Sequence, residues 1–294
     1  MGRGRSVQED PVRAPCAPGR EDAQLEGARP GRHAVRLERS RRQATACRCH
    51  HPRIEGALSD EWSDWVWYQV TVDTNCREVV DNIVDMAHFF YVHYSFPTYF
   101  KNVFEGHVAS QFMRGEARED MRPHASGQPK MLGSRSDATY FGPSFMIDDL
   151  VYQYEDHDVV SILINCHYPV SANQFVLQYG MIVKKSKRLE GAAADEMAKN
   201  FGVFIAKGFE QDIEIWKNKT RIENPLLCEE DGPVYQLRRW YEQFYVDVAD
   251  VTPEMTERFE FELDTTRPVE SWKKEVEANV ARKAIGSDAA IAVH

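Results

Sequence analysis

The sequence lacks several features that would assign it to particular classes of protein. No apolar run approaches the roughly 18 residues of a membrane-spanning helix, and no signal-peptide pattern opens the chain. Its six cysteines show no disulfide-framework spacing, and a chain of 294 residues can bury a large core without disulfides. Basic residues are outnumbered by acidic ones, 36 to 46, so the net charge is -10. We therefore expect a cytoplasmic protein without a membrane span and without a nucleic-acid partner.

Residues 1–53 contain no lysine, phenylalanine, tyrosine or tryptophan. They hold twelve arginines against six acids, which gives a charge of +6, and they show no hydrophobic period. Such a segment buries too little apolar surface to offset the entropy lost on ordering, so we expect it to be disordered. The composition changes abruptly at residues 52–56, which favours out-of-frame translation of a GC-rich gene over an arginine-rich arm that binds anionic partners.

The rest of the chain has the pattern of a globular domain with strands, hairpin turns and helices. A helix is predicted from Asn75, a plausible N-cap with Glu78 three residues later. A long loop is expected over 114–138, and a long helix over 192–216. Strands are predicted over 65–72, 104–113, 144–154, 159–167 and 174–183.

Two histidines in H-x4-H spacing, His88 and His93, lie in an apolar and aromatic run after two aspartates and an asparagine. Asp85 and His88 share one face of a helix. His88 and His93 lie about 140° apart around an ideal helix, because five residues separate them. Both can bind one metal only if the helix kinks, carries a π-bulge or ends between them. Pro97 fits a helix that stops here.

Histidines beside carboxylates suit a divalent first-row metal, and two histidines with one carboxylate form the facial triad of non-haem Fe(II) oxygenases. A pair of structural core histidines is the alternative. A further acid could come from the end of the long helix, at Glu210, Asp212 or Glu214. Asp212 and Ile213 cannot both point to solvent, so we expect one acid to face inward and the others to be solvated.

Residues 82–105, NIVDMAHFFYVHYSFPTYFKNVFE, resemble the catalytic domain of Rieske-type oxygenases. They are most similar to the family of 3-ketosteroid 9α-hydroxylase oxygenase components. The resemblance runs from about residue 52 to about residue 280. Its further matches are INCHYP at 164–169, QDIEIW at 211–216, TRIENPLL at 220–227, VYQLRRWY at 234–241 and FYVDVADVT at 244–252.

The resemblance implies the composition of the metal site. His88, His93 and Asp212 would hold a mononuclear Fe(II), and Asn82 could approach the same ion. Asp85 would be the bridge by which electrons arrive from the Rieske cluster of a neighbouring subunit. The expected activity is O2-dependent steroid hydroxylation, as used in the breakdown of cholesterol.

The resemblance also implies a fold and a substrate pocket. The fold would be an α+β helix-grip (START-like) domain, in which a curved antiparallel sheet wraps over a long helix. Asn165, Phe89 and Tyr91 would line the steroid pocket. The catalytic domain would cover 54–285, followed by a tail over 286–294.

The family carries a second cofactor, a [2Fe-2S] cluster held by two cysteines and two histidines in a C-x-H and C-x-x-H signature. Here Cys49-His50-His51 is a bare C-x-H, and the next cysteine, Cys76, has Val79 three residues later. The cluster ligands are therefore absent. We expect the chain to be the catalytic half of such an oxygenase, which is a homotrimer in the family. Alone it should not sustain hydroxylation with a ferredoxin-type reductase.

Two other classes of function remain open from the sequence. A helix-grip module can bind a sterol without catalysis, although such a module needs no imidazoles in its pocket. A metal enzyme could also use the same triad for hydrolysis.

Overall fold

The computed structural model describes residues 52–54, 59–121, 130–187 and 190–291, with side chains described as far as residue 283. The expected disordered segment therefore lies outside the described residues, apart from Pro52 and Arg53. The Cys49-His50-His51 motif lies outside them too. None of the described helices is long and apolar enough to cross a membrane.

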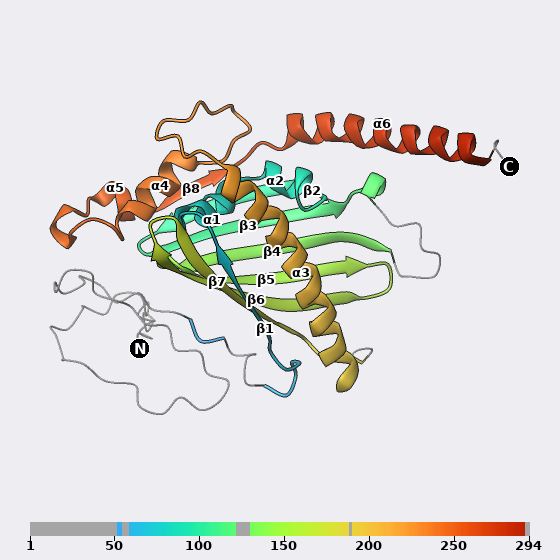
Figure 1. The fold of residues 1–294 in the computed structure, drawn as a ribbon, viewed down its shortest axis with the longest axis horizontal. Helices are drawn as coiled ribbons and strands as arrows, with labels where there is room; N and C mark the ends of the chain where they lie inside the picture. The colour runs from blue at the N-terminus through green and yellow to red at the C-terminus, as the bar shows by residue number, and fades with distance from the viewer. Residues whose placement is uncertain (1–51, 55–58, 122–129, 188–189, 292–294) are drawn as a thin grey trace, which may run out of the picture. The chain divides into compact units, whose positions relative to one another are not determined.

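An eight-stranded antiparallel sheet dominates the described part of the chain (Figure 1). Strands β2 to β7 follow one another as a meander, β1 pairs with β7 at one edge, and β8 pairs with β2 at the other. The α+β prediction is therefore confirmed. The strands are β1 Val66–Val72, β2 Ser95–Glu105, β3 Val108–Ala117, β4 Met131–Phe141, β5 Phe145–Tyr154, β6 Asp158–Ser171, β7 Gln174–Val183 and β8 Phe259–Glu262.

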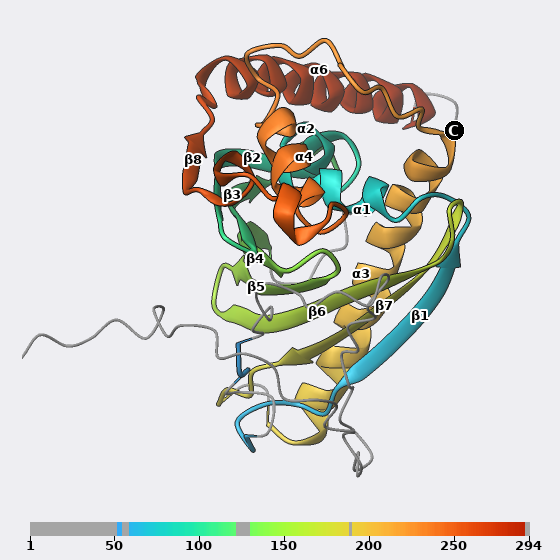
Figure 2. The ribbon, with the colours of Figure 1, turned by 90° about the vertical axis from the view of Figure 1, so that its left-hand side faces the viewer.

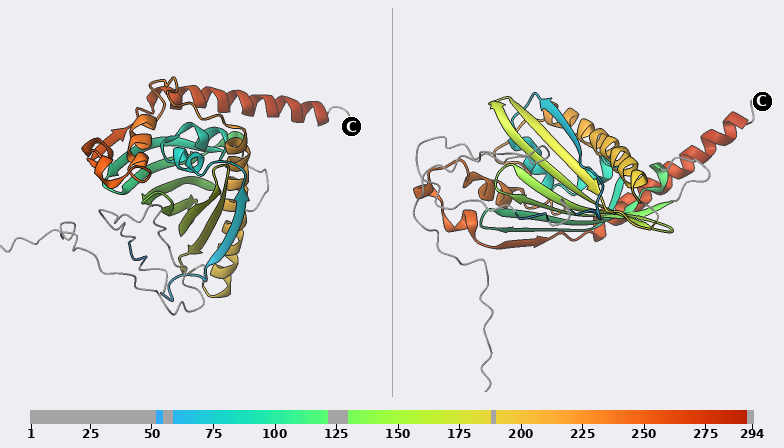
Figure 3. Two further views of the ribbon diagram at one scale, coloured as in Figure 1. Left: turned by 60° about the vertical axis from the view of Figure 1, so that its left-hand side comes forward. Right: turned by 90° about the horizontal axis from the view of Figure 1, so that it is seen from below.

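The helices lie mainly against one face and one end of the sheet (Figures 2 and 3). The α-helices are α1 Arg77–Asp81, α2 Ala87–Tyr91, α3 Ala192–Asn218, α4 Val234–Glu242, α5 Pro253–Thr256 and α6 Thr266–Ile291. The 3-10 helices are η2 Asn82–Val84, η3 Glu119–Met121 and η4 Val248–Asp250. Because α6 continues to Ile291, the domain boundary expected at residue 285 falls within a helix.

The long helix α3 packs across the sheet through one apolar stripe. Its buried residues include Ala194, Ala198 and Phe201, at the three- and four-residue spacing of an amphipathic helix. Gly202 lies in the same stripe, and a Cβ added there would lie 2.7 Å from the ring of Tyr68 on β1. Small residues therefore allow α3 to approach the sheet closely, and the main core forms between them.

Two predictions in the first half of the sheet are wrong. The predicted strand over 104–113 crosses a hairpin turn, where Gly106 has a φ of +56° between β2 and β3. The predicted loop over 114–138 contains most of β4. That strand turns the small or polar residues Ser134, Ser136 and Ala138 toward the cavity, so it lacks the hydrophobic alternation by which strands are recognised.

A smaller core attaches α6 to the segment that carries the histidines. The indole of Trp272 on α6 stacks on Phe90 of α2, with ring centroids 4.7 Å apart and an interplanar angle of 7°. Phe96 and Phe100 of β2 complete this cluster. The helix therefore supports α2 from the side opposite the sheet's main core.

Candidate metal centre and its cavity

The local fold between residues 75 and 95 explains how two histidines five residues apart can face one point. The predicted helix begins where expected, because α1 starts at Arg77 and the Arg77 N–H donates to Asn75 Oδ1 at 3.0 Å. Its continuation as one helix through the histidines is wrong: Asp85 is extended, with φ of -92° and ψ of 100°. Helix α2 then ends at Tyr91, and Tyr94 has a φ of +55°, so the chain turns sharply into β2. His93 therefore lies beyond the helix end, which is one of the three geometries that the spacing required.

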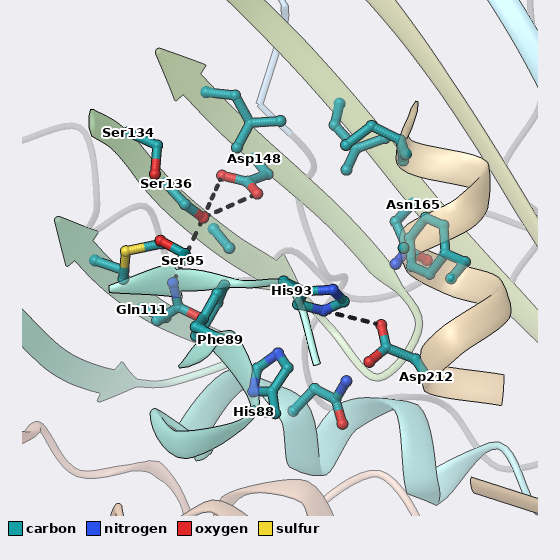
Figure 4. Close-up of a pocket in the computed structure, with 18 of the residues that line it drawn as sticks. His88, Phe89, His93, Ser95, Gln111, Ser134, Ser136, Asp148, Asn165 and Asp212 are labelled. Carbon is teal, nitrogen blue, oxygen red and sulfur yellow. Dashed lines mark hydrogen bonds and ion pairs between the residues drawn. The ribbon is translucent and has the colours of Figure 1, made fainter. Parts of the chain in front are cut away.

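His88, His93 and Asp212 come together on the wall of a cavity (Figure 4). Their potential ligand atoms all lie within 4.8 Å of one another. The two imidazole centroids are 5.0 Å apart, and His93 Nε2 lies 3.3 Å from Asp212 Oδ2. Asp212 is buried on α3, whereas Glu210 and Glu214 are exposed, which confirms that one acid of the three faces inward.

Asp85 holds His88 in a defined orientation. The Nδ1 of His88 donates to the backbone carbonyl of Asp85 at 2.5 Å, and the backbone N–H of His88 donates to Asp85 Oδ1 at 3.2 Å. This tautomer leaves Nε2 without a proton and free to bind a metal. Burial is the largest influence on His88 and lowers its pKa, so the imidazole is neutral at neutral pH. The Asp85 carboxylate itself is exposed.

Asn82 also lines the cavity, but its amide oxygen already has a partner. Trp216, one helical turn after Asp212, donates its indole N–H to Asn82 Oδ1 at 3.1 Å. That oxygen therefore already accepts one hydrogen bond in this structure. The hydrogen bond ties the histidine segment to α3.

A group of charged side chains strengthens the same junction. Lys219, just after α3, lies 2.8 Å from Glu78 and 3.0 Å from Asp81 of α1. Arg238 of α4 contacts Asp81 at 3.1 Å. Because Glu78 is buried and each acid has a cation, the network fixes α1 relative to the end of α3.

The cavity has a volume of about 370 Å³ and is mostly apolar. Phe89 and Asn165, which the resemblance placed in a steroid pocket, line this cavity, and the buried Asn165 Oδ1 accepts no hydrogen bond from the described residues. Tyr91, predicted as a wall, does not line it: its side chain is exposed and its hydroxyl accepts a hydrogen bond from Trp272 at 3.3 Å. Other walls come from Val79, Ile83, Met113, Tyr140, Met146, Leu150, Leu163, Phe204, Phe209 and Trp216.

A second polar group in the cavity was not predicted. The Ser136 hydroxyl donates to both carboxylate oxygens of Asp148 at 3.0 Å, and Gln111 Nε2 donates to Ser136 Oγ at 3.5 Å. Burial raises the pKa of Asp148 to about 7. The sequence does contain a signal for this residue, because Asp148 lies between Met146 and Leu150 at two-residue spacing, on the same inward face of β5.

Replacing Asp148 with asparagine should therefore stabilise the protein at pH 8 but not at pH 4. The folded-state pKa is raised from 3.8 to about 7, so ionisation reduces stability as the pH rises between these values. A shift of this size corresponds to at most about 4 kcal/mol, and water entering the cavity lowers it, so we expect about 2 kcal/mol. Chemical denaturation of both proteins at the two pH values measures the difference. An equal gap at pH 4 and pH 8 would contradict a buried, titrating carboxyl.

Comparison with known proteins places this cavity in a family. The chain matches the family model of the 3-ketosteroid 9alpha-hydroxylase C-terminal domain over residues 40–245. It is 82% identical over 233 residues to a 3-ketosteroid-9-alpha-monooxygenase oxygenase component of Rhodococcus rhodochrous, covering 79% of this chain and 59% of that protein. It is 54% identical over 238 residues to the protein of the same name from Mycobacterium tuberculosis, covering 81% and 61%.

The solved structure of dicamba monooxygenase bound to 3,6-dichlorosalicylic acid has the same fold, with a TM-score of 0.52 at 16% identity, covering 66% of this chain and 62% of that one. The chain therefore has the fold of that structure, with a cluster of two histidines and one carboxylate on the wall of its cavity. The chain belongs to the 3-ketosteroid 9alpha-hydroxylase C-terminal domain family. It spans about three fifths of the length of the curated relatives it matches.

Proposed function

We propose that this chain forms the catalytic part of a 3-ketosteroid 9α-monooxygenase, with a mononuclear iron held by His88, His93 and Asp212. The observation that carries the proposal is the position of these three side chains on the wall of an apolar cavity, in a chain of this family. We also propose that the arrangement of the sheet around α3 is of the helix-grip class.

The donor set fits Fe(II). Two neutral imidazoles and one carboxylate are the ligands of the facial triad, and they leave coordination positions open for other molecules. Iron bound there would supply the activation of O2 that hydroxylation of an unactivated C–H bond requires. Asn82 has its oxygen engaged by Trp216, so we assign it to positioning the histidine segment, and the ligand set to three residues.

The cavity suits a steroid. Its volume of about 370 Å³ falls in the range of small-molecule sites, and its apolar walls exclude water and hold fused rings by burial. Phe89 lies beside both histidines, with its ring centroid 4.2 Å from that of His88 and 5.9 Å from that of His93. Phe89 can therefore set how closely the rings of a bound steroid approach the metal. Asn165 offers an unused amide oxygen inside the cavity and would contact the substrate there.

Asp85 is proposed as the electron bridge because it joins the metal site to the surface. Its backbone carbonyl holds a metal-binding histidine, while its carboxylate is exposed. In the whole protein, a [2Fe-2S] cluster supplied with electrons by a ferredoxin-type reductase would meet this carboxylate across a subunit interface of a homotrimer.

A peroxide reaction tests the proposal in this chain. Hydrogen peroxide supplies both the oxygen atom and the two electrons, so no external electron donor is needed. Chain loaded with Fe(II) and given a 3-ketosteroid and peroxide should form 9-hydroxylated steroid, detected by mass spectrometry, and Asp212→Ala should form at least about tenfold less. Equal product with both proteins would sink the metal assignment. Steroid binding that is unchanged by metal, with no product, would instead indicate a sterol-binding module.

A further inference from the structure

The cavity carries polar side chains on two separate sides. One side holds the metal centre, and the other holds Asp148 with Ser136 and Gln111 (Figure 4). The side chains between them are mostly apolar. A ligand that fills this space and touches the metal centre also reaches a polar group that the proposed hydroxylation chemistry does not use.

The hydrogen bonds around Asp148 leave one proton available to a ligand. Ser136 Oγ accepts from Gln111 Nε2 and directs its own proton at the Asp148 carboxyl. No lysine or arginine forms an ion pair with Asp148 in the part of the chain that the structure describes, and the residue is only 7% exposed. A buried carboxylate without a cation is costly, so the neutral form is favoured. A neutral carboxyl group has one O–H donor, and Ser136 is already engaged.

The charged neighbours act in the same direction. Asp149 on the same strand and Asp137 on β4 both raise the pKa of Asp148, after the larger effect of burial. Arg135 lies near but pairs with Asp137, at 3.7 Å between Nε and Oδ2. Lys207 of α3 also lines the cavity, but it is not among the main causes of the shift in the pKa of Asp148. Below about pH 7, Asp148 is therefore a hydrogen-bond donor facing an apolar space.

We propose that Asp148 donates a hydrogen bond to the C3 ketone oxygen of the bound steroid and thereby sets its orientation. The inference rests on the proposed function, since a steroid presented to the metal at C9 has its C3 oxygen on a different ring. That oxygen is also the one acceptor that every 3-ketosteroid carries. A steroid without the oxygen does not form this hydrogen bond and therefore binds less tightly.

Binding of matched steroids tests the assignment. Equilibrium dialysis from pH 6 to pH 9 compares androst-4-ene-3,17-dione with androst-4-en-17-one, which lacks the C3 oxygen, and with androst-4-en-3-one, which lacks the C17 oxygen. At pH 6 the chain should bind the dione about tenfold more tightly than androst-4-en-17-one, the ratio expected for one hydrogen bond. This preference should disappear above about pH 7. Androst-4-en-3-one should behave as the dione does.

Two variants separate a donor from a merely structural residue. Asp148→Asn keeps a neutral donor, so it should retain the preference for the dione and lose its pH dependence. Asp148→Leu should weaken binding of the dione about tenfold at pH 6 and leave androst-4-en-17-one unchanged, and thermal unfolding confirms that each variant folds. Equal affinities of the wild-type chain for the dione and androst-4-en-17-one at pH 6 would overturn the inference. Weaker binding of androst-4-en-3-one alone would also overturn it, because the C17 oxygen would then be the acceptor. Either result would leave the proposed function intact. No binding of any of the three steroids would overturn both.

Discussion

Replacing His93 with alanine should reduce the iron retained by the chain at least about tenfold. The wild-type chain, incubated anaerobically with Fe(II) and then desalted, should keep about one iron per chain. His93 supplies one of only two imidazoles at the centre, and its Nε2 lies 3.3 Å from Asp212 Oδ2. Without it, only His88 and Asp212 of the three residues offer ligand atoms, which is too few for tight binding. Metal analysis of the desalted proteins gives the ratio.

His157→Ala is the matched control for this experiment. His157 lies in the turn between β5 and β6 and stacks on Tyr154, with centroids 5.1 Å apart, so its loss removes an imidazole without touching the cavity. It should retain iron like the wild type. Equal retention by His93→Ala and His157→Ala would mean that iron binds elsewhere in the chain.

Substituting Gly232 with alanine should destabilise the protein by about 3 kcal/mol or more, the upper end of the range for overpacked sites. A Cβ at this position would lie 1.8 Å from the backbone oxygen of Val84. Backbone has to move to relieve such a contact, and Val84 directly precedes Asp85, the residue that holds His88. Thermal unfolding should therefore shift down by roughly 6–12 °C.

The matched control is Gly191→Ala, at the N-cap of α3. There a Cβ meets nothing within 4 Å, and only the backbone conformation, with φ of +50° and ψ of -125°, opposes it, at a cost of about 1–3 kcal/mol. Gly232→Ala should also lower iron retention, whereas Gly191→Ala should not. A loss of stability no greater than that of Gly191→Ala would show that the segment from Val84 to His88 can shift freely.

The sequence predicted the part of the fold that its hydrophobic periodicity encodes. Strands β5, β6 and β7 and the long helix α3 lie close to the predicted ranges, because apolar alternation and helical spacing are continuous there. Strand β4 was missed because its inward positions include Ser134, Ser136 and Ala138, which carry little hydrophobic signal. One strand was predicted over 104–113, where β2 ends and β3 begins, because apolar residues lie on both sides of Gly106.

The candidate site divides in the same way. The spacing of His88 and His93 limited the backbone geometry to a kink, a π-bulge or a helix end. The structure has the helix end, followed by a positive φ at Tyr94 that no sequence rule indicated. The resemblance implied that Tyr91 lines the cavity, but α2 turns it outward to Trp272. Asp148 was overlooked because only the finished sheet brings β3, β4 and β5 to one wall.

Anomalous diffraction at the iron absorption edge, from crystals of this chain soaked with Fe(II), tests the central claim most directly. We expect one strong anomalous peak in the cavity, bounded by Nε2 of His88, a ring nitrogen of His93 and a carboxylate oxygen of Asp212. A cavity without a peak, in crystals whose iron peak lies at other residues, would contradict it.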